Sequence, residues 1–531
     1  MTPSSPQRFD RLVVLLTTLS VLFVPALAAA AHRAHWSADL SRQVAAGASR
    51  VSVIVQGDPA AVEGLAARYH ARVTRVLQDG VVLRADATDL TGLSAEPAVT
   101  SVSADAVVHA TAADVTDETI GADQLWPSYE GVGGLAGVTG RGIVVAVIDS
   151  GIDRVPGLRG RVIGSFDFVG GADGAPLTDP DNDLYGHGTH VAGLIAGLPG
   201  YAGGGPFSGV APDARLLNLR VLGADGSGQT SDVIDALDWV VAHGRRYGVR
   251  VINLSLGHPA FESYRTDPLC QAVERAVAAG YVVVAAAGNL GKTDTGQPVV
   301  GGITSPGDAP DALTVGALDT HQTPFRSDDT VATYSSRGPT AYDHLIKPDL
   351  VAPGNKLVSL EAPGSYLAST YPQLVVAGHG RNGYFQLSGT SQAAAVASGA
   401  VALLLDAEPR LGPAQVKGVL QLSATYLPSA GLIGGGAGSL NVLAAVDLAR
   451  HGLRGQWLPT TTIAGETVQA SGLAFGSNAS VQGSTIVWGN TIVWGNTIVW
   501  GNTIVWGNTI VWGNTIVWGN TIVWGNTIVW G

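Results

Sequence analysis

Between about residues 116 and 452, short apolar segments of strand length alternate with helical segments. Most of the apolar segments are hydrophobic throughout rather than at every second position, as expected of parallel strands that are covered on both faces. The alternation predicts a doubly wound α/β domain with a mostly parallel sheet, in which chemistry gathers where the strands end. Strands are expected at Ile143–Ile148, Arg215–Val221, Val251–Ser255, Val282–Ala286 and Ala312–Val315, with helices at Asp232–His243 and Pro268–Ala279.

Residues 1–31 have the pattern of a secretory signal peptide. They begin polar with Arg8 and Arg11, run apolar from Leu12 to Val24, and end in a mostly alanine segment typical of a cleavage site. A retained membrane anchor is the alternative, but polar residues and Pro25 interrupt the apolar stretch. The protein is therefore expected to be secreted or held at the cell surface.

A smaller unit is expected at residues 47–110, where short strands of period two alternate with amphipathic helices. This order predicts a small α+β sandwich of the split β-α-β, ferredoxin-like type. Because the unit lies between an export signal and a larger domain, a pro-segment is favoured over an independent binding domain. The expected elements are strand Val51–Gln56, helix Pro59–Tyr69, strands Arg72–Leu77 and Gly80–Ala85, helix Thr88–Ser94 and strand Val99–Ala104.

Composition excludes several classes of protein. The chain carries 30 Lys+Arg against 42 Asp+Glu, a net charge of -12, which argues against nucleic acid as a partner. The single cysteine, Cys270, excludes an intrachain disulfide and any cluster of thiolate ligands. Its apolar neighbours in an expected helix favour a core residue over a nucleophile.

The C-terminal residues 485–531 repeat the unit Thr-Ile-Val-Trp-Gly-Asn, after an expected linker at residues 453–484. An even period places Ile and Trp on one face of a strand, so each copy predicts a β-unit ending at Gly-Asn, in a solenoid or a stacked sheet. Two interpretations stay open. The repeats could serve cell-surface adhesion or self-association, or they could be an expanded low-complexity tail prone to aggregation.

Three segments converge on one reaction. Asp149 ends an apolar strand, His187 opens a helix of small residues, and Ser391 begins a helix that is nearly all alanine. A serine hydroxyl needs an imidazole to accept its proton and a carboxylate to orient that imidazole. A helix N-terminus also offers a free N–H where negative charge develops. Each residue alone could be an ordinary cap, but their joint occurrence favours a catalytic triad.

At these residues the chain resembles the subtilisin-like serine peptidases, over roughly residues 51–451. The segments around Asp149 and His187 fit the family pattern, whereas the segment around Ser391 departs from it at Gln392, usually methionine, and at Ala395, usually proline. Loss of the proline restores a backbone N–H and removes no reacting group. The resemblance implies an acyl-enzyme on Ser391 and no required cofactor.

The resemblance also implies the rest of the site. Asn289 would donate into the oxyanion hole, and two segments would clamp an extended peptide by main-chain hydrogen bonds, which implies broad specificity. A pocket behind the second segment would favour an apolar side chain, with Thr304 shortening its floor. The two clamping segments are Gly226, Ser227 and Gly228, and Ser255, Leu256 and Gly257.

Two further expectations follow from the resemblance. The acidic loop with Asp179, Asp181 and Asp183 is a candidate site for structural calcium, although a solvated acidic turn fits it better. Residues 47–110 would act as an intramolecular inhibitor that the enzyme removes by cleaving itself between about His109 and Thr119.

The favoured function is a secreted serine endopeptidase that acts on proteins or peptides. One alternative is a surface adhesion or assembly protein that works through the Trp repeats and carries a weak or inactive peptidase domain. A soluble esterase is a third.

Overall fold

The computed structural model describes residues 32–45, 47–77, 79–105, 116–126, 135–177, 183–198, 207–378, 380–451 and 459–476, and strands between residues 480 and 530. The expected signal peptide lies outside the described residues. The chain forms two compact units, Met1–Val107 and Val108–Gly531.

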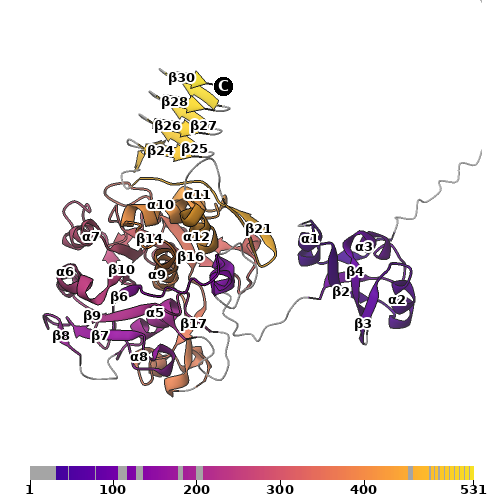
Figure 1. Ribbon diagram of the computed structural model, residues 1–531, viewed down its shortest axis with the longest axis horizontal. Coiled ribbons are helices and arrows are strands. Elements are labelled where there is room, and N and C mark those ends of the chain that lie inside the picture. The colour runs from indigo at the N-terminus through magenta and orange to yellow at the C-terminus, as the bar shows by residue number, and fades with distance from the viewer. Residues whose placement is uncertain are drawn as a thin grey trace, which may run out of the picture. The chain divides into compact units, whose positions relative to one another are not determined.

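The first unit is an α+β sandwich whose elements follow the predicted order (Figure 1). Its five strands lie in the order β1-β5-β2-β4-β3, and all neighbours are antiparallel except β1 and β5. The unit begins before the predicted start at residue 47, because β1 extends the sheet and α1 precedes β2. The elements are β1 His35–Trp36, α1 Ala38–Ala45, β2 Arg50–Gln56, α2 Pro59–Ala66, β3 Arg72–Leu77, β4 Gly80–Asp86, α3 Ala87–Leu93 and β5 Ser101–Ala104.

The second unit contains the predicted doubly wound sheet. Seven strands run parallel in the order β7-β9-β6-β10-β12-β14-β16, and β8 and β15 add antiparallel edges. After β6 the chain adds β7 and β9 on one side of it and then β10, β12, β14 and β16 on the other, so the topological switch point lies between β6 and β10. The strands are β6 Val144–Asp149, β7 Val162–Asp167, β8 Ala175–Pro176, β9 Arg215–Arg220, β10 Val249–Leu254, β12 Val282–Ala286, β14 Leu313–Asp319, β15 Thr330–Val331 and β16 Leu350–Pro353.

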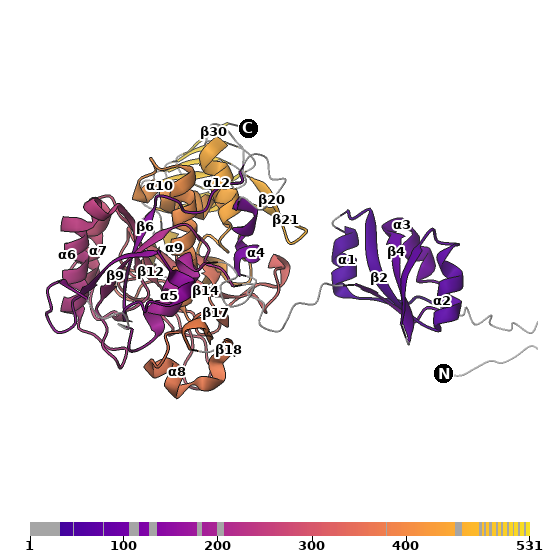
Figure 2. The same ribbon diagram turned by 60° about the horizontal axis from the view of Figure 1, so that its bottom comes forward.

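Helices cover both faces of this sheet (Figure 2). Successive residues of β6 enter two separate cores: Val145 and Val147 pack with α5 and α9, while Ala146 and Ile148 pack with α6 and α7. Burial on both faces is the physical reason for the continuous apolar runs in the sequence. The helices are α5 His187–Ala196, α6 Thr230–Tyr247, α7 Pro268–Ala278, α9 Thr390–Ala407, α10 Pro413–Ser423 and α12 Val442–His451.

Helix α9 runs through the middle of its core. Its alanines from Ala393 to Ala402, among them Ala395, are fully buried, and the helix continues through Ala395 without interruption. Small side chains let the helix pack closely against β10, β12, β14 and β16. Among the described residues α9 is the one helix long and apolar enough to span a membrane, but 83% of it is buried inside the protein, as in the core helix of a folded domain.

The segment predicted as a linker contains a hairpin that belongs to the second unit. Strands β20 (Thr460–Ile463) and β21 (Glu466–Gln469) pair antiparallel. Gln124 Nε2 donates to the Thr462 carbonyl at 2.9 Å, and Phe475 is buried in a small apolar cluster. The prediction of a linker over residues 453–484 is therefore wrong for residues 459–476, because contacts to distant parts of the chain hold them.

The repeats form strands that pair with every second copy. Strands β24, β26, β28 and β30 make one parallel sheet, and β25, β27 and β29 make another (Figure 1). Identical positions align, as Trp494 with Trp506 and Trp506 with Trp518. Two sheets fed alternately by successive copies are the arrangement of a β-solenoid, one of the two predicted forms. The strands are β24 Thr491–Trp494, β25 Thr497–Trp500, β26 Thr503–Trp506, β27 Thr509–Trp512, β28 Thr515–Trp518, β29 Thr521–Trp524 and β30 Thr527–Trp530.

Candidate active site

The structure brings Asp149 and His187 together at the switch point of the sheet. Asp149 is the last residue of β6 and is buried, and its Oδ1 lies 2.8 Å from His187 Nδ1. Gly188 is required next to His187, because a Cβ there would lie 2.1 Å from the Gly151 carbonyl oxygen. The motif Gly-His-Gly thus lets the start of α5 approach the end of β6 closely.

The electrostatics favour a protonated His187 more than an isolated imidazole would. Burial lowers the pKa of His187, but the charge of Asp149 and the hydrogen bond to it outweigh burial, so the pKa is raised above its ordinary value. The imidazole faces Asp149 through Nδ1, which leaves Nε2 for the opposite side of the ring.

Asp183 is hydrogen-bonded to residues on both sides of this motif. Its Oδ1 accepts hydrogen bonds from Ser150 Oγ at 2.8 Å and from the N–H of Gly186 at 2.7 Å. Its Oδ2 accepts the N–H and the hydroxyl of Thr189 at 2.7 and 2.6 Å. Four hydrogen bonds already engage the carboxylate, so these contacts do not support calcium ligation by Asp183, which stays a prediction. Asp179 and Asp181 lie outside the described residues.

Ser391 lies in the first turn of α9 and is bound to the end of β10. Its hydroxyl donates to the Ser255 carbonyl at 2.9 Å, and the Ser255 hydroxyl donates to the Ser391 carbonyl at 2.7 Å. Ser255 and His187 both line a cavity of about 420 Å³. The structure therefore places Ser391 beside the cavity that His187 lines, with its hydroxyl turned towards Ser255.

Asn289 follows β12 and is fixed by the residue before the serine. Its Oδ1 accepts the N–H of Thr390 at 2.9 Å and the Thr390 hydroxyl at 3.1 Å. Its amide nitrogen lies 3.5 Å from the position that a Cβ on Gly389 would take, and so faces the turn that leads into α9. The role of Thr390 is not visible from the sequence, because Thr390 is one small residue in a motif of small residues.

The six predicted clamp residues all line the same cavity, together with His187 and Tyr185. Gly226 has φ +77, and Gly257 allows close approach because a Cβ there would lie 2.4 Å from the Ser305 carbonyl oxygen. Thr304 lies against this wall, 3.2 Å from the same Cβ position through its Oγ1. The clamp residues in the cavity wall are Gly226, Ser227, Gly228, Ser255, Leu256 and Gly257.

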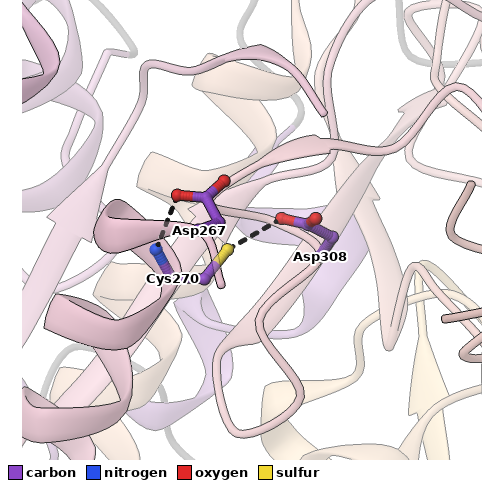
Figure 3. A group of neighbouring side chains, drawn as sticks. All are labelled: Asp267, Cys270 and Asp308. Atoms are coloured by element: carbon purple, nitrogen blue, oxygen red, sulfur yellow. Dashed lines mark hydrogen bonds between the residues drawn. The ribbon is translucent and has the colours of Figure 1, made fainter. Parts of the chain in front are cut away.

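Cys270 belongs to a separate buried cluster with Asp267 and Asp308 (Figure 3). Its thiol donates to Asp308 Oδ1 at 3.0 Å, and Asp267 Oδ1 accepts the N–H groups of Leu269 and Cys270 at the start of α7. Burial raises the pKa of the Cys270 thiol strongly, which keeps it protonated. This arrangement agrees with the expected core role of Cys270 and not with a nucleophile.

Comparison with known proteins gives consistent matches. The sequence profile of the Subtilase family matches residues 140–443. Serine protease AprX of Bacillus subtilis is 40% identical over 289 residues, which cover 54% of this chain and 61% of AprX, and Subtilisin Savinase of Lederbergia lenta is 36% identical over 300 residues, covering 56% and 90%. The solved structure of an S41 Psychrophilic Protease is 29% identical with a TM-score of 0.49, covering 63% of this chain and all of that one.

Proposed function

The chain belongs to the subtilase family, and from this premise we propose that it is a secreted serine endopeptidase with Ser391, His187 and Asp149 as its catalytic triad. The observation that carries the proposal is the 2.8 Å contact between Asp149 and His187, because His187 lines the cavity beside which the Ser391 hydroxyl lies.

The mechanism follows from these positions. Rotation about the Cα–Cβ bond of Ser391 turns its hydroxyl from Ser255 towards the cavity, where the imidazole of His187 accepts the proton as the oxygen attacks the substrate carbonyl. Asp149 holds the ring and stabilises the imidazolium. His187 then returns the proton to the leaving amine, and water repeats the sequence on the acyl-enzyme. The overall reaction is hydrolysis of one peptide bond.

The developing oxyanion is stabilised by two donors in this proposal. One is the N–H of Ser391 at the start of α9, and the other is the amide of Asn289. Thr390 binds the oxygen of that amide, which keeps its nitrogen available as a donor. Donors fixed before the reaction need no rearrangement as charge develops.

Substrate recognition would rest on main-chain hydrogen bonds to Gly226–Gly228 and Ser255–Gly257. Such bonds ignore side chains, so we propose broad specificity with an apolar preference at the pocket behind Ser255, where Thr304 shortens the floor.

The first unit is proposed to be the inhibitory pro-domain of a zymogen, removed by self-cleavage between about His109 and Thr119. The split β-α-β topology of residues 50–104 and its place between a signal-like segment and the peptidase unit support this role. Residues 109–115 of this cleavage region lie outside the described residues.

The direct test of the proposed function uses the full precursor and its Ser391→Ala variant with a fluorophosphonate probe and casein. We expect the parent to take up the probe, cut itself within the predicted region and degrade casein, while the variant stays whole and unlabelled. A folded parent that neither labels nor cleaves itself would contradict the proposal.

The pH profile tests the role of His187. Catalysis needs the neutral imidazole, and Asp149 raises the pKa of His187 above its ordinary 6.5. Activity should therefore fall in acid with a midpoint above pH 6.5, measured as kcat/KM on a peptide substrate. In the Asp149→Asn variant the midpoint of the residual activity should move to lower pH. Burial still lowers the pKa of His187 there, and the carboxylate that raised it is gone. Activity that stays flat down to pH 5 would rule out His187 as the base.

The Asn289→Ala variant tests the oxyanion donor. We expect kcat to fall by about 10²- to 10³-fold, equivalent to about 2.7–4 kcal/mol, with KM little changed, a magnitude known from subtilisin itself. Thr390→Val should lower kcat by a smaller factor, because the N–H of residue 390 still donates to Asn289. Asn382→Ala, at an exposed asparagine in the short 3-10 helix Gly380–Asn382, serves as the control. A loss that appears mainly in KM would instead assign Asn289 to substrate binding.

The second candidate is an adhesion or assembly function of the repeats. It is supported by the in-register pairing of alternate copies, which arranges the strands between residues 491 and 530 in two regular parallel sheets. The test compares the full chain with a variant that ends at residue 476. We expect the shortened protein to lose binding to the surface of the producing cells and to keep casein hydrolysis. Equal binding by both proteins would contradict this function.

A further inference from the structure

Large apolar side chains are exposed on the protein surface directly beside the catalytic histidine. Leu184 is 55% exposed, Tyr366 48% and Tyr371 40%. Leu184 precedes His187 by three residues, and the two tyrosines belong to α8 (Tyr366–Thr370) and the residue that follows it. We call these three residues the apolar shelf. Exposed apolar groups that cluster on a folded surface mark a binding site.

The apolar shelf is joined to the cleft by Tyr185. The Tyr185 ring stacks on Tyr366 with centroids 5.8 Å apart and an interplanar angle of 15°. It also lies against Gly226 of the substrate clamp, where a Cβ would approach the ring atoms to 2.4 Å. Tyr185 itself lines the cavity that His187 lines. The shelf therefore continues the wall of the substrate cleft.

Backbone hydrogen bonds hold the apolar shelf in place. The N–H of Tyr366 donates to the Leu184 carbonyl at 2.8 Å, and the N–H of Leu367 donates to the Tyr185 carbonyl at 3.1 Å. The buried Ser365 caps α8 by accepting the N–H of Ala368 at 3.3 Å. The exposed rings are thus presented by anchored backbone, which lowers the entropy cost of binding a partner.

We infer that the apolar shelf binds an aromatic or large aliphatic side chain of the polypeptide substrate, close to the bond that is cut. The inference rests on the proposed function. Successive side chains of an extended peptide point to opposite sides. When one enters the pocket behind Ser255–Gly257, its neighbours point away from that pocket, and His187 and Tyr185 are among the other residues that line the same cavity. Neither Leu184–Tyr185 nor α8 contains a charged residue, so the wall favours an apolar group over an ionic one.

The test compares the parent enzyme with Tyr366→Ser and Leu184→Ser on internally quenched peptides. The peptides differ only by Phe or Gly at each of the three positions on either side of the cleaved bond, and enzyme concentration is set by fluorophosphonate titration. We expect the parent to prefer Phe at one flanking position besides the pocket position. In the variants kcat/KM for that peptide should fall about five- to tenfold, mainly because KM rises. For the Gly peptide kcat/KM should change by less than about twofold.

Two further variants guard against a purely structural effect. Tyr366→Phe keeps the ring and should retain the preference, while Tyr342→Ser removes a tyrosine that is 51% exposed elsewhere and should leave the whole peptide series unchanged. If the shelf variants lose the same fraction of kcat/KM on all peptides, or lose none on any, the inference is overturned. Cleavage by the parent would still support the proposed function. Light scattering covers one more outcome. If the parent is a dimer and the variants are monomers with an unchanged peptide preference, the apolar shelf is a contact between copies, which would also overturn the inference. A parent that takes up no probe would defeat both proposals.

Discussion

Replacing Ser391 by alanine should lower kcat by about a million-fold with little change in the folded structure, a magnitude known from subtilisin itself. The hydroxyl is the only group removed, and its hydrogen bond to the Ser255 carbonyl is one bond in a segment also held by the Ser255 hydroxyl. The residual rate would come from the oxyanion donors and substrate binding, which the substitution leaves in place. The measurement is single-turnover hydrolysis of a chromogenic peptide.

The combination with His187→Ala makes this prediction sharper. Because serine and histidine act as a unit, each single variant should lose about as much activity as the double variant. Ser208→Ala, at a partly exposed serine whose hydroxyl donates to the Gly209 carbonyl, is the matched control and should keep full activity. Losses that multiply in the double variant would show that Ser391 and His187 act independently, which the proposed mechanism does not allow.

The sequence predicts the sheet and the motifs because their causes are local. Burial on both faces makes β6 and β12 apolar almost throughout and β9 and β10 mostly apolar, so the predicted positions of these four strands agree with the structure to within two residues. Asp149 and His187 carry their chemistry in the residue type itself, and the strand end and helix start that position them are visible from neighbouring residues. The predicted parallel order then brings both to one edge of the sheet.

Features made by distant parts of the chain are not predictable in this way. Thr390 and Asn289 are 101 positions apart, and the hairpin of residues 460–469 is held by partners such as Gln124, 338 positions from its acceptor. The acidic neighbours of Asp183 suggest a calcium ligand, whereas the partners that occupy it, Ser150 and Thr189, are known only once the segments have folded. The apolar shelf likewise needs the contact between α8 and the loop before His187.

A buried ionic cluster around Asp349 joins the sheet to α10. Asp349 Oδ2 accepts from Lys347 Nζ and from the N–H of Thr314, each at 2.8 Å, and its Oδ1 lies 2.9 Å from Lys417 Nζ. Burial alone would raise the pKa of Asp349, but the two lysines hold it below its ordinary value, whereas burial lowers the pKa of Lys347 to about 8. The Asp349 carboxylate therefore supplies the negative charge that balances the buried ammonium groups of Lys347 and Lys417.

Asp349→Asn should accordingly lower the free energy of unfolding by about 3–5 kcal/mol, because it leaves buried positive charge without a counter-charge. Denaturant unfolding would be followed by tryptophan fluorescence in the Ser391→Ala background, which prevents self-digestion. Asp238→Asn breaks an ion pair with Arg275 that is about half exposed, and should cost only about 0–1 kcal/mol.

The pH dependence of the same variants distinguishes the ionic cluster from simple packing. The pKa of Asp349 is lower in the folded than in the unfolded chain, so its stabilisation is complete above the unfolded value and is lost as the pH falls through the folded value. The stability difference between parent and Asp349→Asn should therefore be constant near neutral pH and shrink in acid. A difference that persists unchanged into strong acid would mean that the asparagine disturbs packing or hydrogen bonding, and that the charge of Asp349 is not what holds α10 to the sheet.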